Sequence, residues 1–156
     1  MGSWGYKALE SDNGLDVVDF LTDYISESKD QVDLSLSKLI AKMKEDGFLG
    51  ETFEDIDYLY DNSAMALTEL YLMFKENGEL DYDHEEENLN LRKRVESFSG
   101  DKNALEFLLR YLTDIQNEVP DEDGEREFVE LWKDAPKYEQ WKEHLNYLIN
   151  GLKSEL

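Results

Sequence analysis

The side chains that most often act as nucleophiles or general bases are scarce in this chain. It contains no cysteine, and His84 and His144 are its only imidazoles. No Gly-x-Ser-x-Gly segment is present to expose a hydrolase serine, and no glycine-rich loop carries the Lys and Ser or Thr that hold nucleotide phosphates. We expect His144 to be a structural or surface imidazole. The sequence therefore favours a protein that is not an enzyme and needs no cofactor.

Carboxylates are abundant, and hard cations such as Ca²⁺ need little more than oxygen ligands. The segment Asp81–Glu87 reads DYDHEEE and surrounds His84 with acids. It lacks the His-Glu-x-x-His pair of zinc enzymes, and it holds one Asp-x-x-His where a di-iron bundle uses two Glu-x-x-His motifs. The loop at Gly124 fails the calcium-loop pattern because Val119 falls in its first position. We predict no dedicated metal site and keep a carboxylate-based metal protein, or metal-dependent enzyme, as the alternative.

Two acidic segments with aromatic residues nearby are typical of surfaces that bind a partner protein. Glu76–Glu87 contains seven acids and no Lys or Arg, and Asp114–Glu130 contains eight acids with Arg126 as its only base. Carboxylates pair with arginine, and tyrosine adds contact area. A third acidic segment, EDIDYLYDN at residues 54–62, alternates acids with tyrosines. The candidate partner-binding residues come from this segment and from Glu76–Glu87, and they are Asp57, Tyr58, Asp61, Asp81, Asp83, Glu85, Glu86 and Glu87.

The net charge supports a basic partner. The chain carries 38 acidic against 16 basic residues, for a formal charge of −22. Such a field repels nucleic acids and anionic membranes and attracts cations. We therefore expect an acidic interaction module, of the kind found among immunity or inhibitor proteins, that binds a basic protein. A housekeeping subunit whose acidity serves solubility is a further alternative.

The location and class of the protein follow from composition. The opening lacks a basic region followed by an apolar run, and no apolar stretch approaches the length of a membrane span, which predicts a cytoplasmic protein. With 156 residues, 40% of them hydrophobic, and only two prolines, the chain suits one helical domain over residues 1–156. We predict an all-α bundle of about six helices with a short irregular N-terminal segment.

Apolar residues spaced three and four apart mark the helical segments. The predicted segments are residues 12–28, 30–47, 52–77, 91–98, 102–119, 128–132 and 138–152. Within the second, VDLSLS alternates as a strand does, but the 4-3-4 spacing that continues to Met43 favours a helix. In the third, Thr52 and Asp55 resemble a capping box and Gly78 supplies the stop. The wide apolar face of this third segment predicts that it is the central helix.

The opening MGSWGYKALESDNGLD contains a Met-Gly-small-Trp-Gly motif followed by Asp12, Asn13 and Asp16. AMALTELYLMFKENGEL forms an alanine-containing central segment, and REFVELWKDAPKYEQWKEHLNYLINGL a closing one with two tryptophans. In these features the chain resembles domain-of-unknown-function family 4259, a family of small bacterial proteins. It departs from the family in Lys7, where Gly is frequent, and in an acidic extension around residues 79–99.

The resemblance implies a compact bacterial domain without recognised catalytic residues. It covers most of the chain, and the opening motif is its most specific part. Because large aromatic side chains usually serve burial, we expect Trp4 to be buried and to anchor the N-terminal segment on the bundle.

Overall fold

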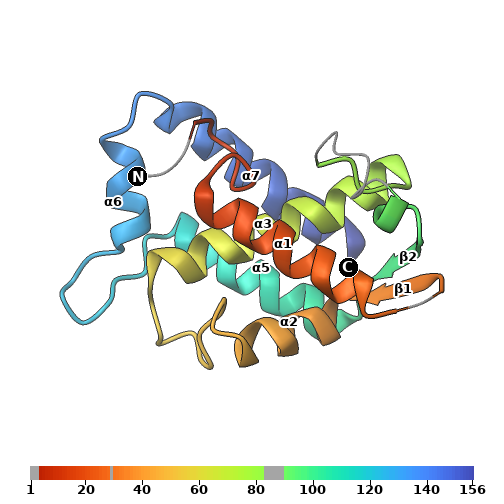
Figure 1. Cartoon of the computed structure of the whole chain (residues 1–156). Coiled ribbons are helices and arrows are strands. Elements are labelled where there is room, and N and C mark those ends of the chain that lie inside the picture. The colour runs from red at the N-terminus through yellow and green to blue at the C-terminus, as the bar shows by residue number, and fades with distance from the viewer. Residues whose placement is uncertain (1–3, 29, 83–89) are drawn as a thin grey trace.

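The computed structural model describes residues 4–28, 30–82 and 90–156, and it is mostly helical, as the sequence predicts. Figure 1 shows the helices packed around one core, with a small sheet at one end. The helices are α1 (Asp12–Ser26), α2 (Leu36–Glu45), α3 (Tyr58–Asn77), α5 (Lys102–Gln116), α6 (Glu127–Lys133) and α7 (Tyr138–Glu155). The strands are β1 (Val32–Ser35) and β2 (Val95–Ser99). Among the described helices, none combines the length and the apolar character needed to cross a bilayer.

Helix α3 is central, as predicted. Every residue from Asp61 to Leu72 is buried, because α1, α5, α6 and α7 all pack against this helix (Figure 1). Its small residues Ser63, Ala64 and Ala66 allow the close approach of neighbouring helices. The predicted start was wrong, since the helix begins at Tyr58.

The N-terminal cap of α3 explains its later start. The Asp57 carboxylate accepts a hydrogen bond from the Leu59 backbone N–H at 2.8 Å, which satisfies a donor that the first helical turn leaves free. Thr52 and Asp55 do form a capping-type bond, 3.3 Å from the Thr52 N–H to the Asp55 carboxylate, but within a separate turn. The helix ends at Gly78, which has a φ of 72° as expected for a left-handed stop.

The small parallel sheet corrects two helix predictions. Strand β1 occupies the start of the predicted helix 30–47, and β2 occupies the second half of the predicted helix 91–98. Val32 pairs with Val95 and Leu34 with Phe98, and all four side chains are buried. Each strand finds its partner about sixty residues away, a contact that local spacing does not encode. The alternation of VDLSLS was therefore the better signal at this position.

The N-terminal segment lies on the bundle through its backbone. The N–H groups of Ala8 and Leu9 donate to the buried carboxylate of Glu69 at 2.7 and 3.0 Å, and Ser11 caps α1. The prediction for Trp4 was wrong, because its side chain is 56% exposed. Ala8, at 2% exposure, is the residue that this segment contributes to the buried hydrophobic core.

A buried ion pair joins α3 to the chain before α6. The Arg126 guanidinium donates to the Asp61 carboxylate at 2.7 and 2.9 Å and to the Val119 carbonyl at 3.1 Å. Asp61 is 0% exposed, so its prediction as a surface residue was wrong. The first turns of α3 are enclosed by the bundle, and a carboxylate placed there requires an internal cation.

The Asp61–Arg126 pair predicts a large effect of truncation on stability. We expect Asp61→Ala to lower the free energy of unfolding by about 3–5 kcal/mol, because it leaves the Arg126 charge buried and unpaired. Urea unfolding checks this, with Asp57→Asn as a control that keeps a good cap and stays within about 0.5 kcal/mol of the parent. A loss below about 1 kcal/mol for Asp61→Ala would contradict the importance of the pair.

The same pair predicts a pH dependence. Burial raises the pKa of Asp61 from 3.8 to about 6, although the hydrogen bonds and charge of Arg126 lower it. The folded state therefore binds this proton more tightly, and the contribution of Asp61 to stability falls as pH rises from about 4 to about 6. Between pH 6 and pH 5 we expect the stability difference between the parent and Asp61→Asn to grow by roughly 1 kcal/mol. Urea titrations at several pH values measure this difference, and parallel curves for the two proteins would refute it.

Candidate partner-binding surface

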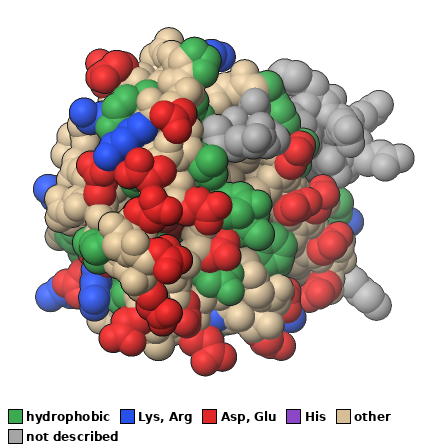
Figure 2. Space-filling view, turned by 90° about the vertical axis from the view of Figure 1, so that its left-hand side faces the viewer, with side chains coloured by type: hydrophobic (Ala, Val, Ile, Leu, Met, Phe, Trp, Pro, Cys, Tyr) green, Lys and Arg blue, Asp and Glu red, His purple; other side chains and the backbone are tan. Residues whose placement is uncertain are grey.

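Tertiary contacts bring two of the acidic segments together. The Asp61–Arg126 pair holds the start of α3 beside the loop 117–126, which lies on the left-hand side of Figure 1. Figure 2 shows this side as a band of carboxylates with exposed hydrophobic side chains between them. The exposed residues of the two segments include Asp57, Tyr58, Leu59, Glu118, Val119, Glu122, Asp123 and Glu125.

The predicted site residues do not form one patch. Asp57 and Tyr58 are exposed at the start of α3, whereas Asp81 is exposed beyond its end. A helix of 20 residues separates them by about 30 Å. Asp83, Glu85, Glu86 and Glu87 lie outside the described residues, as does His84.

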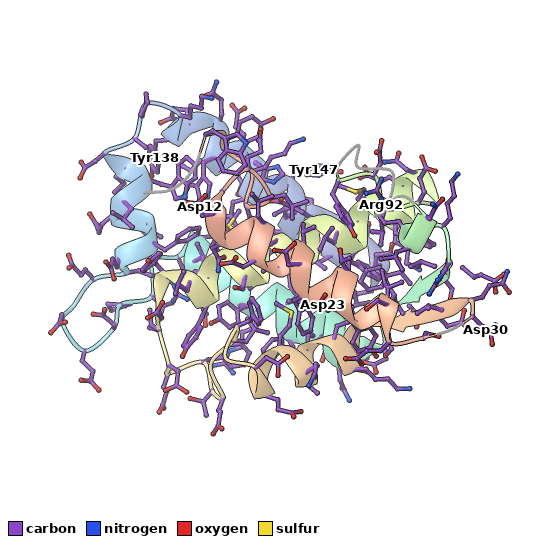
Figure 3. All side chains as sticks on the ribbon, viewed as in Figure 1. Asp12, Asp23, Asp30, Arg92, Tyr138 and Tyr147 are labelled. Carbon is purple, nitrogen blue, oxygen red and sulfur yellow. The ribbon has the colours of Figure 1, made fainter. Side chains whose placement is uncertain are left out.

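A ridge of carboxylates on α1 was not predicted from the sequence. Its members follow one another at spacings of four, three, four and four residues, so they share one face of the helix. They are Asp12, Asp16, Asp19, Asp23 and Glu27, all exposed. Figure 3 shows Asp12 at the beginning of α1 and Asp23 near its end. The acids recur at helical spacing in the sequence, as the apolar residues do. This spacing predicts that they share one face of the helix.

A groove runs beside this ridge, between α1 and the end of α2, and we call it the α1–α2 groove. It has a volume of about 430 Å³. Its aromatic residues are Phe20, Tyr24 and Phe48, with 5.3 Å between the ring centres of Phe20 and Phe48. Its charged residues are Asp16, Asp19, Asp23, Glu27, Asp46 and Lys42.

The α1–α2 groove has a strong excess of negative charge. Lys42 is the one cation among its lining residues, and its ammonium lies 3.4 Å from the Asp46 carboxylate and 3.8 Å from that of Glu45. These two acids raise the pKa of Lys42. The carboxylates on the α1 side therefore face the groove without a cation of their own among the described ion pairs.

Another part of the chain shows which group an aromatic ring and a carboxylate bind together. The Arg110 guanidinium lies 4.0 Å from the ring centre of Phe53, and its Nε lies 3.9 Å from the Asp114 carboxylate. An aromatic face and a carboxylate together are good partners for a guanidinium, through cation–π attraction and charge-assisted contact. The α1–α2 groove presents the same two kinds of group, and a guanidinium from another molecule would find equivalent partners there.

His144 is paired with Glu69, in line with a structural imidazole. Its Nε2 lies 2.9 Å from the Glu69 carboxylate, which also accepts the Ala8 and Leu9 N–H groups. The ring of Tyr6 meets the imidazole edge-on at 5.5 Å between ring centres. This Glu69–His144 pair thus connects α3, α7 and the N-terminal segment.

The described residues contain no group of three or more acidic or histidine side chains placed to hold a metal ion. The acids around His84, on which the metal alternative depended, lie outside the described ranges. The candidate sites among the described residues therefore consist of charged side chains and aromatic rings.

Comparisons with known proteins place this chain by its sequence. The family described as a domain of unknown function, DUF4259, matches residues 2–144. No curated protein and no solved structure matches the chain. The matched residues include the α1 ridge, the α1–α2 groove and both members of the Glu69–His144 pair. Because the match covers most of the chain, the protein belongs to the DUF4259 family.

Proposed function

We propose that this protein is a non-enzymatic interaction module that binds a basic protein through the α1–α2 groove and the α1 ridge. The observation that carries the proposal is the groove itself, where five carboxylates and three aromatic rings face one lysine. An arginine of the partner would stack on these rings and pair with the α1 acids, as Arg110 does with Phe53 and Asp114.

The charge of the whole molecule supports the same partner. A net charge of −22 raises the rate at which a cationic protein meets the surface, and the aromatic rings then contribute contact area at the centre of the interface. Long-range attraction and local packing thus favour the same class of partner.

The surface at Asp57 and Tyr58 extends this footprint. The Asn62 amide donates to Ser11 and Asn13 at 2.9 and 2.8 Å, which holds the start of α3 against the start of α1. The acidic band of Figure 2 therefore adjoins the first turn of the α1 ridge.

Within this class, an immunity or inhibitor protein is the more specific form of the proposal. A partner that normally binds nucleic acid has a cationic surface, and a ridge of regularly spaced carboxylates would occupy it in place of phosphates. A cytoplasmic location is part of this proposal, because such a protein acts where its partner would otherwise be harmful.

Neutralising the ridge should weaken binding. A basic protein is first captured from the native host at low salt and identified, and its affinity is then measured by calorimetry over a range of salt concentrations. We expect Asp16→Asn, Asp19→Asn and Asp23→Asn together to weaken binding on the order of tenfold, which is about 1.4 kcal/mol, and to reduce its salt dependence.

The matched control removes three exposed acids elsewhere, by Glu96→Gln, Glu139→Gln and Glu155→Gln. It changes the net charge equally, and we expect affinity to remain within about twofold of the parent. Equal losses in both triple variants would show that net charge, and not the groove, holds the partner. Failure to capture any cationic protein at low salt would contradict the proposed function.

A further inference from the structure

A second hollow lies beside the Glu69–His144 pair. The side chains that line it differ in chemical character from those of the α1–α2 groove. It has a volume of about 170 Å³ and lies between the N-terminal segment, α3 and α7. Leu9, Leu72 and Leu148 contribute apolar wall, and Lys7 and His144 are among its polar groups. A wider hollow continues outward past Tyr6, Lys7, His144 and Tyr147. We call the first of these the inner hollow.

Hydrogen bonding fixes the chemical state of the imidazole. The Glu69 carboxylate already accepts two backbone N–H groups, and as an acceptor it receives the proton of His144 Nε2. The neutral ring is thereby held as the Nε2–H tautomer, and its Nδ1 carries the free lone pair.

Nδ1 of His144 is available to a ligand. Among the described residues no group bonds to it, and it is not one of the buried atoms sealed from solvent. His144 lines both hollows, and its side chain is 9% exposed. The lone pair is therefore presented at a position where both hollows meet.

The remaining charged groups of the two hollows, apart from the Glu69–His144 pair, are one cation and two acids. The Lys7 ammonium makes no ion pair with the described residues, although it lines both hollows. The Glu76 carboxylate is already occupied by the Tyr147 hydroxyl. Partial burial and this contact raise the pKa of Tyr147 to about 12, so the hydroxyl keeps its proton and remains a donor to Glu76. The second acid, Glu143, is exposed on the outer hollow.

Size and shape indicate the body of the ligand. A dry cavity of about 150 Å³ accommodates one benzene ring, so the inner hollow suits a single six-membered ring. The apolar walls and the ring of Tyr147, 6.0 Å from the imidazole, favour a flat and apolar body. Figure 3 shows Tyr147 on α7, on the side of the molecule away from the α1–α2 groove.

We propose that the inner hollow binds a small ring compound with an acidic hydroxyl, a phenol or enol, and that His144 takes its proton. The O–H bond of the ligand breaks, an N–H bond forms at Nδ1, and both electrons of the O–H bond stay on the oxygen. The resulting oxyanion lies beside the Lys7 ammonium, and the imidazolium lies against the Glu69 carboxylate. Each new charge thus meets an opposite charge already present in the site.

The test uses 3-nitrophenol, whose anion absorbs at longer wavelength than its neutral form. The probe is titrated with the full chain at a pH above the ordinary imidazole pKa of about 6.5 and below the pKa of the probe, so that the imidazole starts neutral and the free probe is mostly protonated. We expect a saturable rise in nitrophenolate absorbance, together with a shift of the His144 side-chain ¹⁵N signals from the Nε2–H tautomer to the doubly protonated ring. His144→Gln is expected to abolish the absorbance change.

Lys7→Met provides a variant that keeps the fold, because Lys7 is exposed and makes no side-chain bond to the described residues. It is expected to weaken probe binding at least fivefold, whereas Lys153→Met, with the same charge change at the far end of α7, leaves binding within twofold. Glu139→Gln, in the first turn of α7 and outside the lining of both hollows, serves as a second control and keeps the absorbance change.

Three outcomes would overturn the inference. They are the absence of saturable binding, binding without ionisation of the probe, and equal binding by the parent, His144→Gln and Lys7→Met. None of them bears on the basic partner, whose binding is measured with variants of α1.

Discussion

Several polar side chains of α3 are buried, among them those of Asp61, Asn62 and Glu69, and each must find hydrogen-bond partners inside the protein. The partners come from three parts of the chain distant in sequence. Arg126 pairs with Asp61, Ser11 and Asn13 accept from Asn62, and Glu69 accepts from the N-terminal segment and His144. The hydrogen bonds to the buried polar side chains of α3 therefore also fix the positions of the segments around this helix.

Each of these buried contacts positions a part of the surface. The Arg126 pair holds the acidic loop 117–126 beside the start of α3, and the Asn62 bonds hold the start of α1 against the same turns. Glu69 places the imidazole of His144 at the edge of the inner hollow. Because a missing partner in the interior costs more than a surface contact gains, the interior sets these positions and the surface follows.

The two candidate sites differ in the kind of charge they present. The α1–α2 groove combines many carboxylates with an aromatic floor and favours a guanidinium or ammonium from outside. The inner hollow contains Lys7 and an imidazole held by a carboxylate, a set that favours a group able to become an anion.

Some features of the candidate sites could be predicted from the sequence, and others could not. Asp57 and Tyr58 are exposed as predicted, since a capping acid and its neighbour lie at a helix end facing solvent. Asp61, four residues further on, has the same local surroundings in sequence and yet is buried. Only the approach of Arg126, sixty-five residues away, distinguishes it from Asp57. His144 likewise gained a defined role only through Glu69, on another helix.

The sequence by itself determined the helical class, the central helix, the excess of acid and the family. These depend on composition and on spacings within a dozen residues, which a helix expresses directly. The tertiary structure alone decided the pairing of β1 with β2, the burial of Asp61, the groove between α1 and α2, and the orientation of His144. Each of these joins residues far apart in the chain, and their free energy arises from burial and hydrogen bonding that exist only once the elements have packed together.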